Sequence, residues 1–373
     1  MASIGIDVRL WKETGIGRYV RNLVENLSEI DDTTQYVLFV LPADLASVKN
    51  QVVHGKFGKN FVFVVADIPW HGVKEQIEFP RLLGKYNLDL MHFPYFSVPV
   101  FYKKPFVVTV HDLIINHFPT GRATTLPLPF YLAKRFGYSY VLKNAIKNSK
   151  IIIAPSIATK QEILDHYSVS DARVVVTPEG VDKNITDFKP AIFKPKSPYF
   201  LYVGNAYPHK NVEKMIEAFL LFSEKHPDYT LKLAGKKDFF YKKLIEKTHN
   251  PKIEFMGYVE DNDLAKLYKF STASIIPSLM EGFGLTTLEA MSLGSLVIAS
   301  DIPSIKEIAG DTVHYFKPTD VLSLVASMEE VSNLSEKKRH EMVQTSKKHV
   351  EKFSWEKTAK LTLDVYNSCL NTK

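Results

Sequence analysis

The sequence predicts an α/β fold with two parallel-sheet domains, and three observations favour it. Short apolar runs bounded by turn residues alternate with amphipathic segments of helical period along nearly the whole chain, as in buried parallel strands joined by helices. A length of 373 residues is comfortable for two domains. The stretch 183–198 is polar, contains prolines and lacks periodicity, as expected of a linker. We therefore expect an N-terminal domain at 1–185 and a C-terminal domain at 198–353.

Composition is that of an ordinary globular protein, with 45% hydrophobic and 24% charged residues. The single Cys369 excludes an internal disulfide framework and a cysteine-based zinc site. The N-terminus lacks the basic and apolar regions of a signal peptide, and no apolar run has the roughly 18 residues of a membrane span, so we expect a cytoplasmic location. A net charge of +6 is compatible with an anionic ligand, nucleic acid or an anionic lipid surface.

Seven short strands are expected in the first half. They cover 3–8, 36–41, 61–66, 88–93, 106–110, 150–155 and 173–177. A helix is expected over 17–27, and the loop before it carries Gly15 and Gly17, a pair that would allow close approach of a phosphate or sugar. The pair also fits a plain connecting turn, because Val20 stands where a dinucleotide fingerprint needs a third glycine.

Residues 126–150 are predicted to be helical, and they interleave aromatic with basic side chains such as Lys134, Arg135 and Lys143. This composition fits contact with RNA or with anionic lipid. It fits equally well a half-buried helix with a solvated basic face.

The second half repeats the alternation. Strands are expected at 199–203, 231–235, 273–277, 296–300 and 313–316, a turn within 254–259, and helices at 211–222, 285–293, 329–348 and 355–370. Lys210 directly precedes the first of these helices, where a lysine can neutralise a pyrophosphate while the helix N–H groups bind its oxygens. On spacing alone, a solvated loop lysine is the simpler interpretation.

The segment 277–291 carries the most specific pattern. A buried strand leads into a tight loop with Gly282 and Gly284, and a helix follows whose free N–H groups make an anion site. Glu281 lies in the loop and Glu289 is eight residues further on. Two carboxylates at the ends of a phosphate-binding turn suit a nucleotide sugar, which has hydroxyls at both ends and phosphates between. Without further support, two solvated glutamates on a surface helix would explain the same letters.

This segment resembles the E-x7-E signature of the retaining glycosyltransferases of family 4. The resemblance covers almost the whole chain, because the glycine loop, His111, Lys210, a turn at Gly257 and the two glutamates occur in the family's order. It implies the GT-B fold, in which two Rossmann-like domains face each other across a cleft. It also implies that the C-terminal helix, within 354–373, crosses back to the first domain.

The resemblance assigns roles to single residues. His111, Glu281 and Lys210 would be catalytic, His111 beside the reacting carbon, although a lone histidine at a strand end is more often structural. The implied donor-binding residues are Gly15, Gly17, Asn205, Lys210, Gly257, Tyr258, Val259, Glu281, Gly282, Phe283, Gly284, Leu285, Thr286 and Glu289.

Two positions depart from the family pattern. Asn205 replaces a common arginine, which leaves the diphosphate to Lys210 with His209, and Glu179 replaces a usual asparagine. Glu289 would bind the ribose hydroxyls and Glu281 the donor-sugar hydroxyls.

Five further segments carry a narrower resemblance: Gly5-Ile6-Asp7-Val8-Arg9, Thr14-Gly15-Ile16-Gly17-Arg18-Tyr19, Glu75-Gln76, His92-Phe93-Pro94 and Pro208-His209-Lys210-Asn211. With them the chain looks like bacterial mannosyltransferases that build O-antigen and other surface polysaccharides. This implies GDP-mannose as donor, with a UDP-sugar as the alternative, and a saccharide or lipid-linked saccharide as acceptor at the inner face of the plasma membrane. Contact with anionic membrane is compatible with 126–150, and no nucleic acid partner is expected. A cofactor or metal is not expected to be required, because cationic side chains and helix dipoles can replace Mg²⁺. A sugar-nucleotide epimerase and a non-catalytic two-lobed sugar-binding protein are the rival classes.

Overall fold

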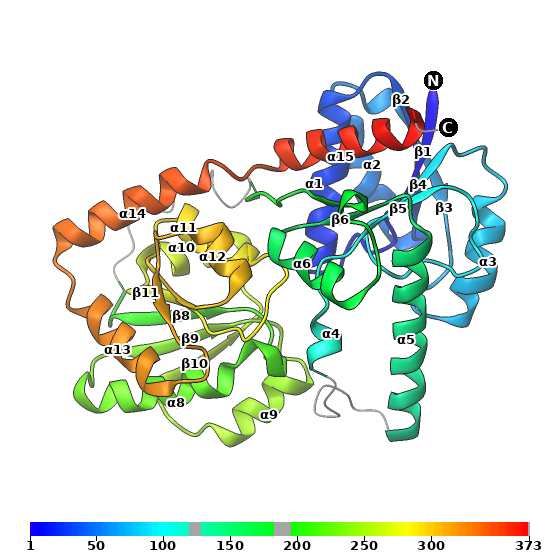
Figure 1. Ribbon diagram of the computed structural model, residues 1–373. Coiled ribbons are helices and arrows are strands. Elements are labelled where there is room, and N and C mark those ends of the chain that lie inside the picture. Colours follow the sequence, from blue (N-terminus) through cyan, green and yellow to red (C-terminus); the bar gives the residue numbers. More distant parts are fainter. Residues whose placement is uncertain (119–127, 183–194, 372–373) are drawn as a thin grey trace. The chain divides into compact units, whose positions relative to one another are not determined.

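The computed structural model describes residues 1–118, 128–182 and 195–371. The chain forms two compact units (Figure 1). The first comprises Met1–Leu113, Thr124–Gly180 and Ser354–Lys373, and the second Ile114–Ala123 and Val181–Phe353. Each unit is built on one parallel sheet with helices in the connections, so the predicted α/β class is confirmed. Most of the predicted linker, 183–194, lies outside the described residues.

The first unit carries a seven-stranded sheet in the order β3-β2-β1-β4-β5-β6-β7, and the strands pair in parallel. The strands are β1 (Ala2–Asp7), β2 (Thr34–Val40), β3 (Phe61–Val65), β4 (Leu90–Phe93), β5 (Phe106–Thr109), β6 (Ile151–Ala154) and β7 (Val174–Val176). Its helices are α1 (Gly15–Ile30), α2 (Leu45–Val53), α3 (Val73–Leu83), α5 (Leu128–Asn148), α6 (Ile157–His166) and α15 (Trp355–Asn371). The strand order reverses between β1 and β4, and ligands of open α/β sheets bind beyond the carboxyl ends of such strands.

The second unit carries a six-stranded parallel sheet in the order β10-β9-β8-β11-β12-β13. The strands are β8 (Tyr199–Val203), β9 (Thr230–Ala234), β10 (Ile253–Gly257), β11 (Ala273–Ile276), β12 (Val297–Ser300) and β13 (His314–Phe316). The helices are α4 (Ile114–His117), α8 (Val212–Lys225), α9 (Phe239–Lys247), α10 (Asp261–Phe270), α11 (Leu285–Ser292), α12 (Pro303–Ala309), α13 (Val321–Ser332) and α14 (Glu336–Val350). This is the strand order of the dinucleotide-binding fold, and its reversal point lies between β8 and β11.

Alternation along the central strands of the second unit builds a core on each face of the sheet. Leu201 and Ile276 pack with α11 and α12, whereas Phe200 and Ile275 pack with α8 and α13. Successive side chains of a strand point to opposite faces, so strands buried on both faces need apolar residues at every position. The apolar runs of the sequence therefore became strands.

One predicted helix is wrong. A single charged helix is predicted over 329–348, but α13 ends at Ser332 and a separate helix, α14, begins at Glu336. Ser335 causes the restart, because its hydroxyl accepts a hydrogen bond from the backbone N–H of Lys338 and caps α14. A good N-cap residue inside a polar stretch outweighed the helical propensity of its neighbours.

The C-terminal helix α15 belongs to the first unit, as predicted. It runs along α1 (Figure 1), and its residue Trp355 packs edge-on against Tyr19 of α1 with ring centroids 6.0 Å apart. Among the described helices, none is long and apolar enough to cross a membrane.

Candidate functional site

Two loops of the second unit meet at the point where its strand order reverses. Lys210 ends the 3₁₀ turn Pro208–Lys210 that follows β8, and Glu281 lies in the loop that follows β11. The backbone N–H of Leu279 donates to the carbonyl of His209 over 2.7 Å and ties the loops together. Residues far apart in sequence thus come together at the sheet edge where a ligand is expected.

Lys210 and Glu281 form a bidentate ion pair. Lys210 Nζ lies 2.7 and 2.9 Å from the two carboxylate oxygens of Glu281, and Ser278 Oγ donates to Oε1 over 2.6 Å. Burial would raise the pKa of Glu281, but Lys210 and Ser278 outweigh it and hold that pKa below its ordinary value. Sequence reasoning proposed separate roles for the two residues and did not foresee that each is the other's partner.

His209 does not add a cation to this loop at neutral pH. Burial and the charge of Lys210 lower the pKa of His209 to about 4, against a smaller opposing effect of Glu281. Asn205, at the start of the same loop, accepts a hydrogen bond from the backbone N–H of Tyr207 through its side-chain oxygen, over 3.3 Å. Lys210 therefore supplies the positive charge at this end of β8.

The glycine turn opens α11 as the sequence predicted. Gly284 has φ of +106° and is the N-cap, a left-handed conformation that suits glycine. Phe283 is buried, with its ring 6.0 Å from that of Phe353, so only its backbone can contact a ligand. Leu285 and Thr286 follow in the first turn of the helix, where N–H groups lack intrahelical partners.

Two polar side chains of α11 are buried in the second unit. Glu289 is 2% exposed, and the hydroxyl of Tyr268 donates to its Oε2 over 3.4 Å. The hydroxyl of Thr287 is buried and has no hydrogen-bond partner within the described parts of the chain. Buried hydroxyl groups normally have a hydrogen-bond partner, so Thr287 is an exception to that rule.

The predicted turn after β10 is also present. Gly257 has φ of +76°, and its carbonyl accepts from the N–H of Gly235 over 2.9 Å. Tyr258 is 73% exposed, whereas Val259 packs against the core. An Asp-x-Asp sequence follows at 261–263. Both carboxylates are exposed in the first turn of α10, where their negative charge interacts favourably with the helix dipole and stabilises the helix.

In the first unit, the predicted glycine loop is part of a helix. Gly15 and Gly17 lie in the first turn of α1, which begins earlier than expected. A Cβ on Gly17 would lie 2.6 Å from the carbonyl oxygen of Trp11, so this glycine serves a close backbone contact. A Cβ on Gly15 would meet nothing within 4 Å, so this position has open space beside it. The two glycines therefore differ. Gly17 is needed for close packing against the backbone, whereas the space beside Gly15 is open.

His111 follows β5 and is held by both ring nitrogens. Nδ1 lies 3.1 Å from Glu179 Oε1 and Nε2 lies 2.9 Å from the carbonyl oxygen of Pro94. The Tyr19 ring packs nearly perpendicular to the His111 ring, with the two centroids 4.8 Å apart. Burial would lower the pKa of His111, but Glu179 and Pro94 outweigh it and raise that pKa above its ordinary value. The only sequence signal for Glu179 was its departure from a family asparagine.

Two family models match the chain in succession. Residues 14–184 match Glycosyltransferase Family 4, and residues 183–349 match Glycosyl transferases group 1. The chain belongs to glycosyltransferase family 4.

Known proteins extend this likeness. The chain is 27% identical to O-antigen chain mannosyltransferase B of Escherichia coli, over 95% of this chain and 96% of the relative. Among solved structures, sucrose-phosphate synthase from Thermosynechococcus elongatus superposes with a TM-score of 0.78 at 18% identity, covering 100% of both chains. HepE of Anabaena in complex with UDP-glucose superposes with a TM-score of 0.75 at 14% identity, covering 99% and 100%. These structures support the predicted GT-B fold.

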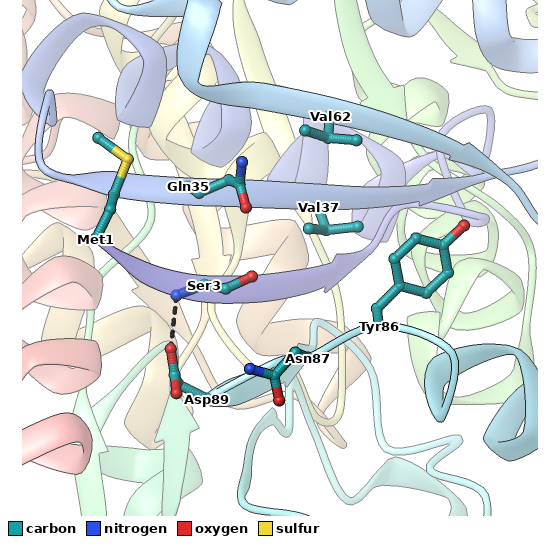
Figure 2. A pocket seen from close by; sticks show the side chains of 8 residues that line it. All are labelled: Met1, Ser3, Gln35, Val37, Val62, Tyr86, Asn87 and Asp89. Atoms are coloured by element: carbon teal, nitrogen blue, oxygen red, sulfur yellow. Dashed lines mark hydrogen bonds between the residues drawn. The ribbon is translucent and has the colours of Figure 1, made fainter.

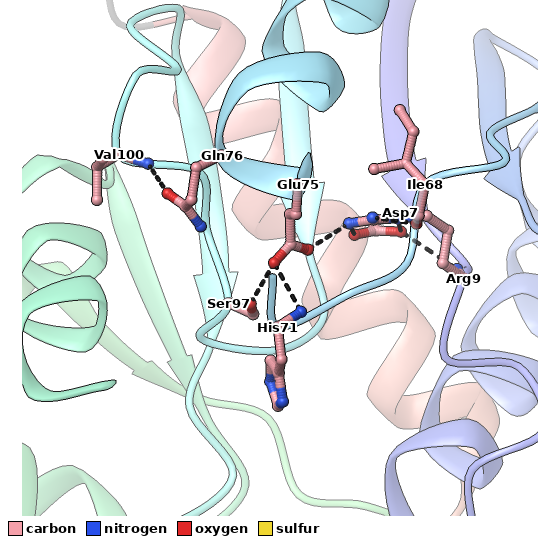
Figure 3. Close-up of polar contacts among 8 residues, drawn as sticks. All are labelled: Asp7, Arg9, Ile68, His71, Glu75, Gln76, Ser97 and Val100. Carbon is pink, nitrogen blue, oxygen red and sulfur yellow. Dashed lines mark hydrogen bonds and ion pairs between the residues drawn. The ribbon is translucent and has the colours of Figure 1, made fainter. Parts of the chain in front are cut away.

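This glycosyltransferase has a buried ionic cluster where the strand order of its first unit reverses. Arg9 donates 2.7 Å hydrogen bonds to Asp7 and Glu75 (Figure 3). The other oxygen of Glu75 accepts from Ser97 Oγ over 2.8 Å and from the backbone N–H of His71 over 2.9 Å. In the sequence, Asp7, Arg9 and Glu75 are only parts of the resemblance to mannosyltransferases. In the structure their contacts hold two loops together.

A surface pocket of about 470 Å³ lies elsewhere on the first unit of the glycosyltransferase (Figure 2). It is lined by Met1, Ser3, Gln35, Val37, Val62, Tyr86, Asn87 and Asp89. Met1 and Ser3 stand at the start of β1, so the pocket is at the amino end of that strand and away from the carboxyl ends that carry the candidate site.

Proposed function

We propose that the chain is a retaining mannosyltransferase that moves mannose from GDP-mannose to a saccharide or lipid-linked saccharide in surface polysaccharide synthesis. The mannosyltransferase relative, similar over nearly the full length of both chains, is the observation that carries the choice of sugar. A UDP-sugar is the alternative donor, since a structural neighbour binds UDP-glucose.

The second unit would hold the donor. Lys210 would pair with the diphosphate, and the N–H groups of Gly284, Leu285 and Thr286 would bind its oxygens with the help of the helix dipole. Gly282 and Phe283 would offer backbone groups to the sugar. Glu281 would accept hydrogen bonds from sugar hydroxyls once the diphosphate draws Lys210 away from it.

The nucleoside would lie toward the other groups at this edge. Glu289 would accept from the ribose hydroxyls, while Gly257, Tyr258 and Val259 would contact the base. Asn205 would donate one uncharged hydrogen bond.

The transfer breaks the bond between the anomeric carbon and the diphosphate oxygen, and it forms a bond from that carbon to the acceptor hydroxyl on the same face. The acceptor proton passes to the departing diphosphate. Positive charge at Lys210 and the free N–H groups of α11 would stabilise the negative charge that grows on this leaving group. We propose that these groups suffice without a metal ion, so activity should survive EDTA.

A thermal-shift series with GDP, UDP, ADP and their sugar conjugates tests the donor. A bound ligand raises the unfolding temperature in proportion to the logarithm of its concentration over Kd. Stabilisation by GDP and GDP-mannose, followed by mannosyl transfer to a saccharide acceptor, is the expected result. A preference for UDP would rule out GDP-mannose as the donor but leave the assignment as a glycosyltransferase intact. No response to any nucleotide would contradict the proposed function.

We also propose that α5 contacts an anionic membrane that presents a lipid-linked acceptor. Leu132, Phe136 and Tyr140 are 51%, 74% and 57% exposed and recur every four residues, so they share one face of the helix. The 21 residues of α5 include no acidic residue. Its basic residues are Lys134, Arg135, Lys143 and Lys147. An exposed apolar stripe flanked by cations is typical of helices that lie on anionic lipid.

Vesicle flotation tests this contact. The protein should bind phosphatidylglycerol vesicles at low salt, bind phosphatidylcholine vesicles much more weakly, and be released by high salt. Phe136→Glu should abolish binding, whereas Phe101→Glu, which alters a residue exposed to 64% outside α5, should not. Equal binding by both variants would exclude α5 as the contact.

A further inference from the structure

Both hydrogen bonds of the His111 ring end on acceptors. Nδ1 faces the carboxylate of Glu179 at 3.1 Å, and Nε2 faces the carbonyl oxygen of Pro94 at 2.9 Å. A backbone carbonyl can only accept, and an ionised carboxylate can only accept, so each contact requires an N–H on the ring. A neutral imidazole has one N–H and an imidazolium has two.

We propose that Glu179 is a positioning residue that holds His111 as an imidazolium with a fixed ring, so that His111 acts as a hydrogen-bond donor and not as a base. The proposal rests on the proposed function for its consequence in catalysis, but the protonation state itself can be measured without any substrate. The carboxylate and the imidazole are 6% and 13% exposed, so solvent does little to screen their charges.

The groups around His111 favour the charged ring. Besides Glu179, Asp112 is the negative neighbour. The other neighbours are His92 and Tyr19. Burial and the charge of His111 lower the pKa of His92 to about 3, and burial raises the pKa of Tyr19. Both are uncharged at neutral pH, so neither opposes a positive charge on His111.

The backbone fixes Glu179 from both sides. The carbonyl of Pro178 accepts a hydrogen bond from Thr358 Oγ1 over 2.5 Å, at the start of α15. On the other side, a Cβ on Gly180 would lie 2.2 Å from the backbone nitrogen of Trp355, so this backbone is packed directly against the chain that enters α15. A carboxylate on so constrained a segment can hold the His111 ring in one orientation, which a partner on a free loop could not.

A permanently protonated His111 cannot take the proton of the acceptor hydroxyl. This agrees with the transfer proposed above, in which that proton leaves with the diphosphate. His111 would then orient sugar or acceptor oxygens with an N–H, exchanging its bond to Pro94 for one to the ligand.

Long-range ¹H–¹⁵N correlation spectra of ¹⁵N-histidine-labelled protein test the proposal directly. The His111 signals are assigned by their absence in His111→Gln. Without substrate at pH 7, both ring nitrogens should show the shifts of an imidazolium. Signals of a neutral ring, with one protonated and one bare nitrogen, would overturn the proposal even if the protein proved to be an active mannosyltransferase.

Glu179→Gln supplies the second arm. Glutamine keeps an acceptor oxygen but removes the charge, so His111 should become neutral at pH 7. The ratio of kcat/KM at pH 8 to that at pH 6 should then fall by at least about tenfold, because an ordinary imidazole loses most of its protonated form between these two pH values. Glu330→Gln, which removes the carboxylate 3.5 Å from His314, is the matched control and should change neither readout. A Glu179→Gln protein whose His111 stays an imidazolium with an unchanged pH profile would contradict the role of Glu179.

Discussion

His92 Nδ1 lies 2.6 Å from the hydroxyl oxygen of Tyr366, a contact between residues 274 positions apart in the chain. The other ring nitrogen of His92 lies 2.8 Å from Thr109 Oγ1, so a histidine in β4 joins β5 to the C-terminal helix. The ring is fully buried. A buried histidine between two hydroxyl groups is most stable when neutral, because a hydroxyl can donate to one nitrogen and accept from the other.

We expect the first unit to lose stability as the pH falls from about 6.5 toward 3. The unfolded chain binds a proton at His92 near pH 6.5, whereas burial and the charge of His111 lower the pKa of His92 in the folded protein to about 3. Protonation therefore favours the unfolded chain between these values, at about 1.4 kcal/mol per pH unit. Urea unfolding from pH 7 to pH 4 measures the slope, which should be flatter in His92→Gln. An unchanged slope in that variant would assign the acid sensitivity to other groups.

The two glycines of α1 should respond oppositely to alanine. Gly17→Ala forces a methyl group against the carbonyl oxygens of Leu10 and Trp11 and should cost more than 1 kcal/mol. Gly15→Ala meets no atom and should stabilise the helix by about 0.4–1 kcal/mol. Thermal melts of the two variants compare the effects. If Gly15 contacts the donor, Gly15→Ala should raise KM while the melting temperature stays the same or rises.

Substitutions of Lys210 and of Glu281 should change the affinity for the diphosphate in opposite directions. Lys210→Ala removes the cation and should weaken binding of the nucleoside diphosphate by about 10- to 100-fold. Glu281→Gln removes the carboxylate that occupies Lys210, so diphosphate affinity should be kept or increased while transfer is abolished. Calorimetric titration and turnover assays on both folded variants check this. An active Glu281→Gln enzyme would refute the assigned role of Glu281.

Removing Glu75 should strongly destabilise the first unit. Glu75→Ala leaves Arg9 with one of its two carboxylate partners and frees two donors, those of Ser97 and His71, so we expect a loss of about 3–5 kcal/mol in unfolding free energy. Glu78→Ala on the same helix is the matched control. The side chain of Glu78 is 49% exposed and 3.7 Å from Lys74, so its loss should cost less than about 1 kcal/mol. Equal unfolding midpoints for both variants would contradict this view of the cluster.

The sequence predicted best what depends on local pattern. The apolar runs became strands because parallel strands buried on both faces need apolar residues throughout, and Gly284 was recognisable because a turn before a helix often needs positive φ. The break before Ser335 was missed, because a cap competes with helical propensity and propensity alone does not decide between them.

Contacts across long sequence separations could not be predicted in the same way. The partnerships of Lys210 with Glu281 and of His111 with Glu179 join residues 71 and 68 positions apart. Each partnership depends on the strand order, because that order brings two loops to the same edge of the sheet. The apolar pattern of a strand does not show which strands pair with it. The roles assigned to these residues in catalysis stay predictions until the variants above are measured.

Because α15 belongs to the first unit, that unit is finished last when the chain is synthesised. A ribosome must release residues beyond Phe353 before Trp355 can reach Tyr19 and Tyr366 can reach His92. The second unit is complete in sequence by then and can fold first, against the usual N-to-C order of domain folding. A released chain that ends at residue 353 should therefore protect its second unit from protease while its first unit is still cleaved.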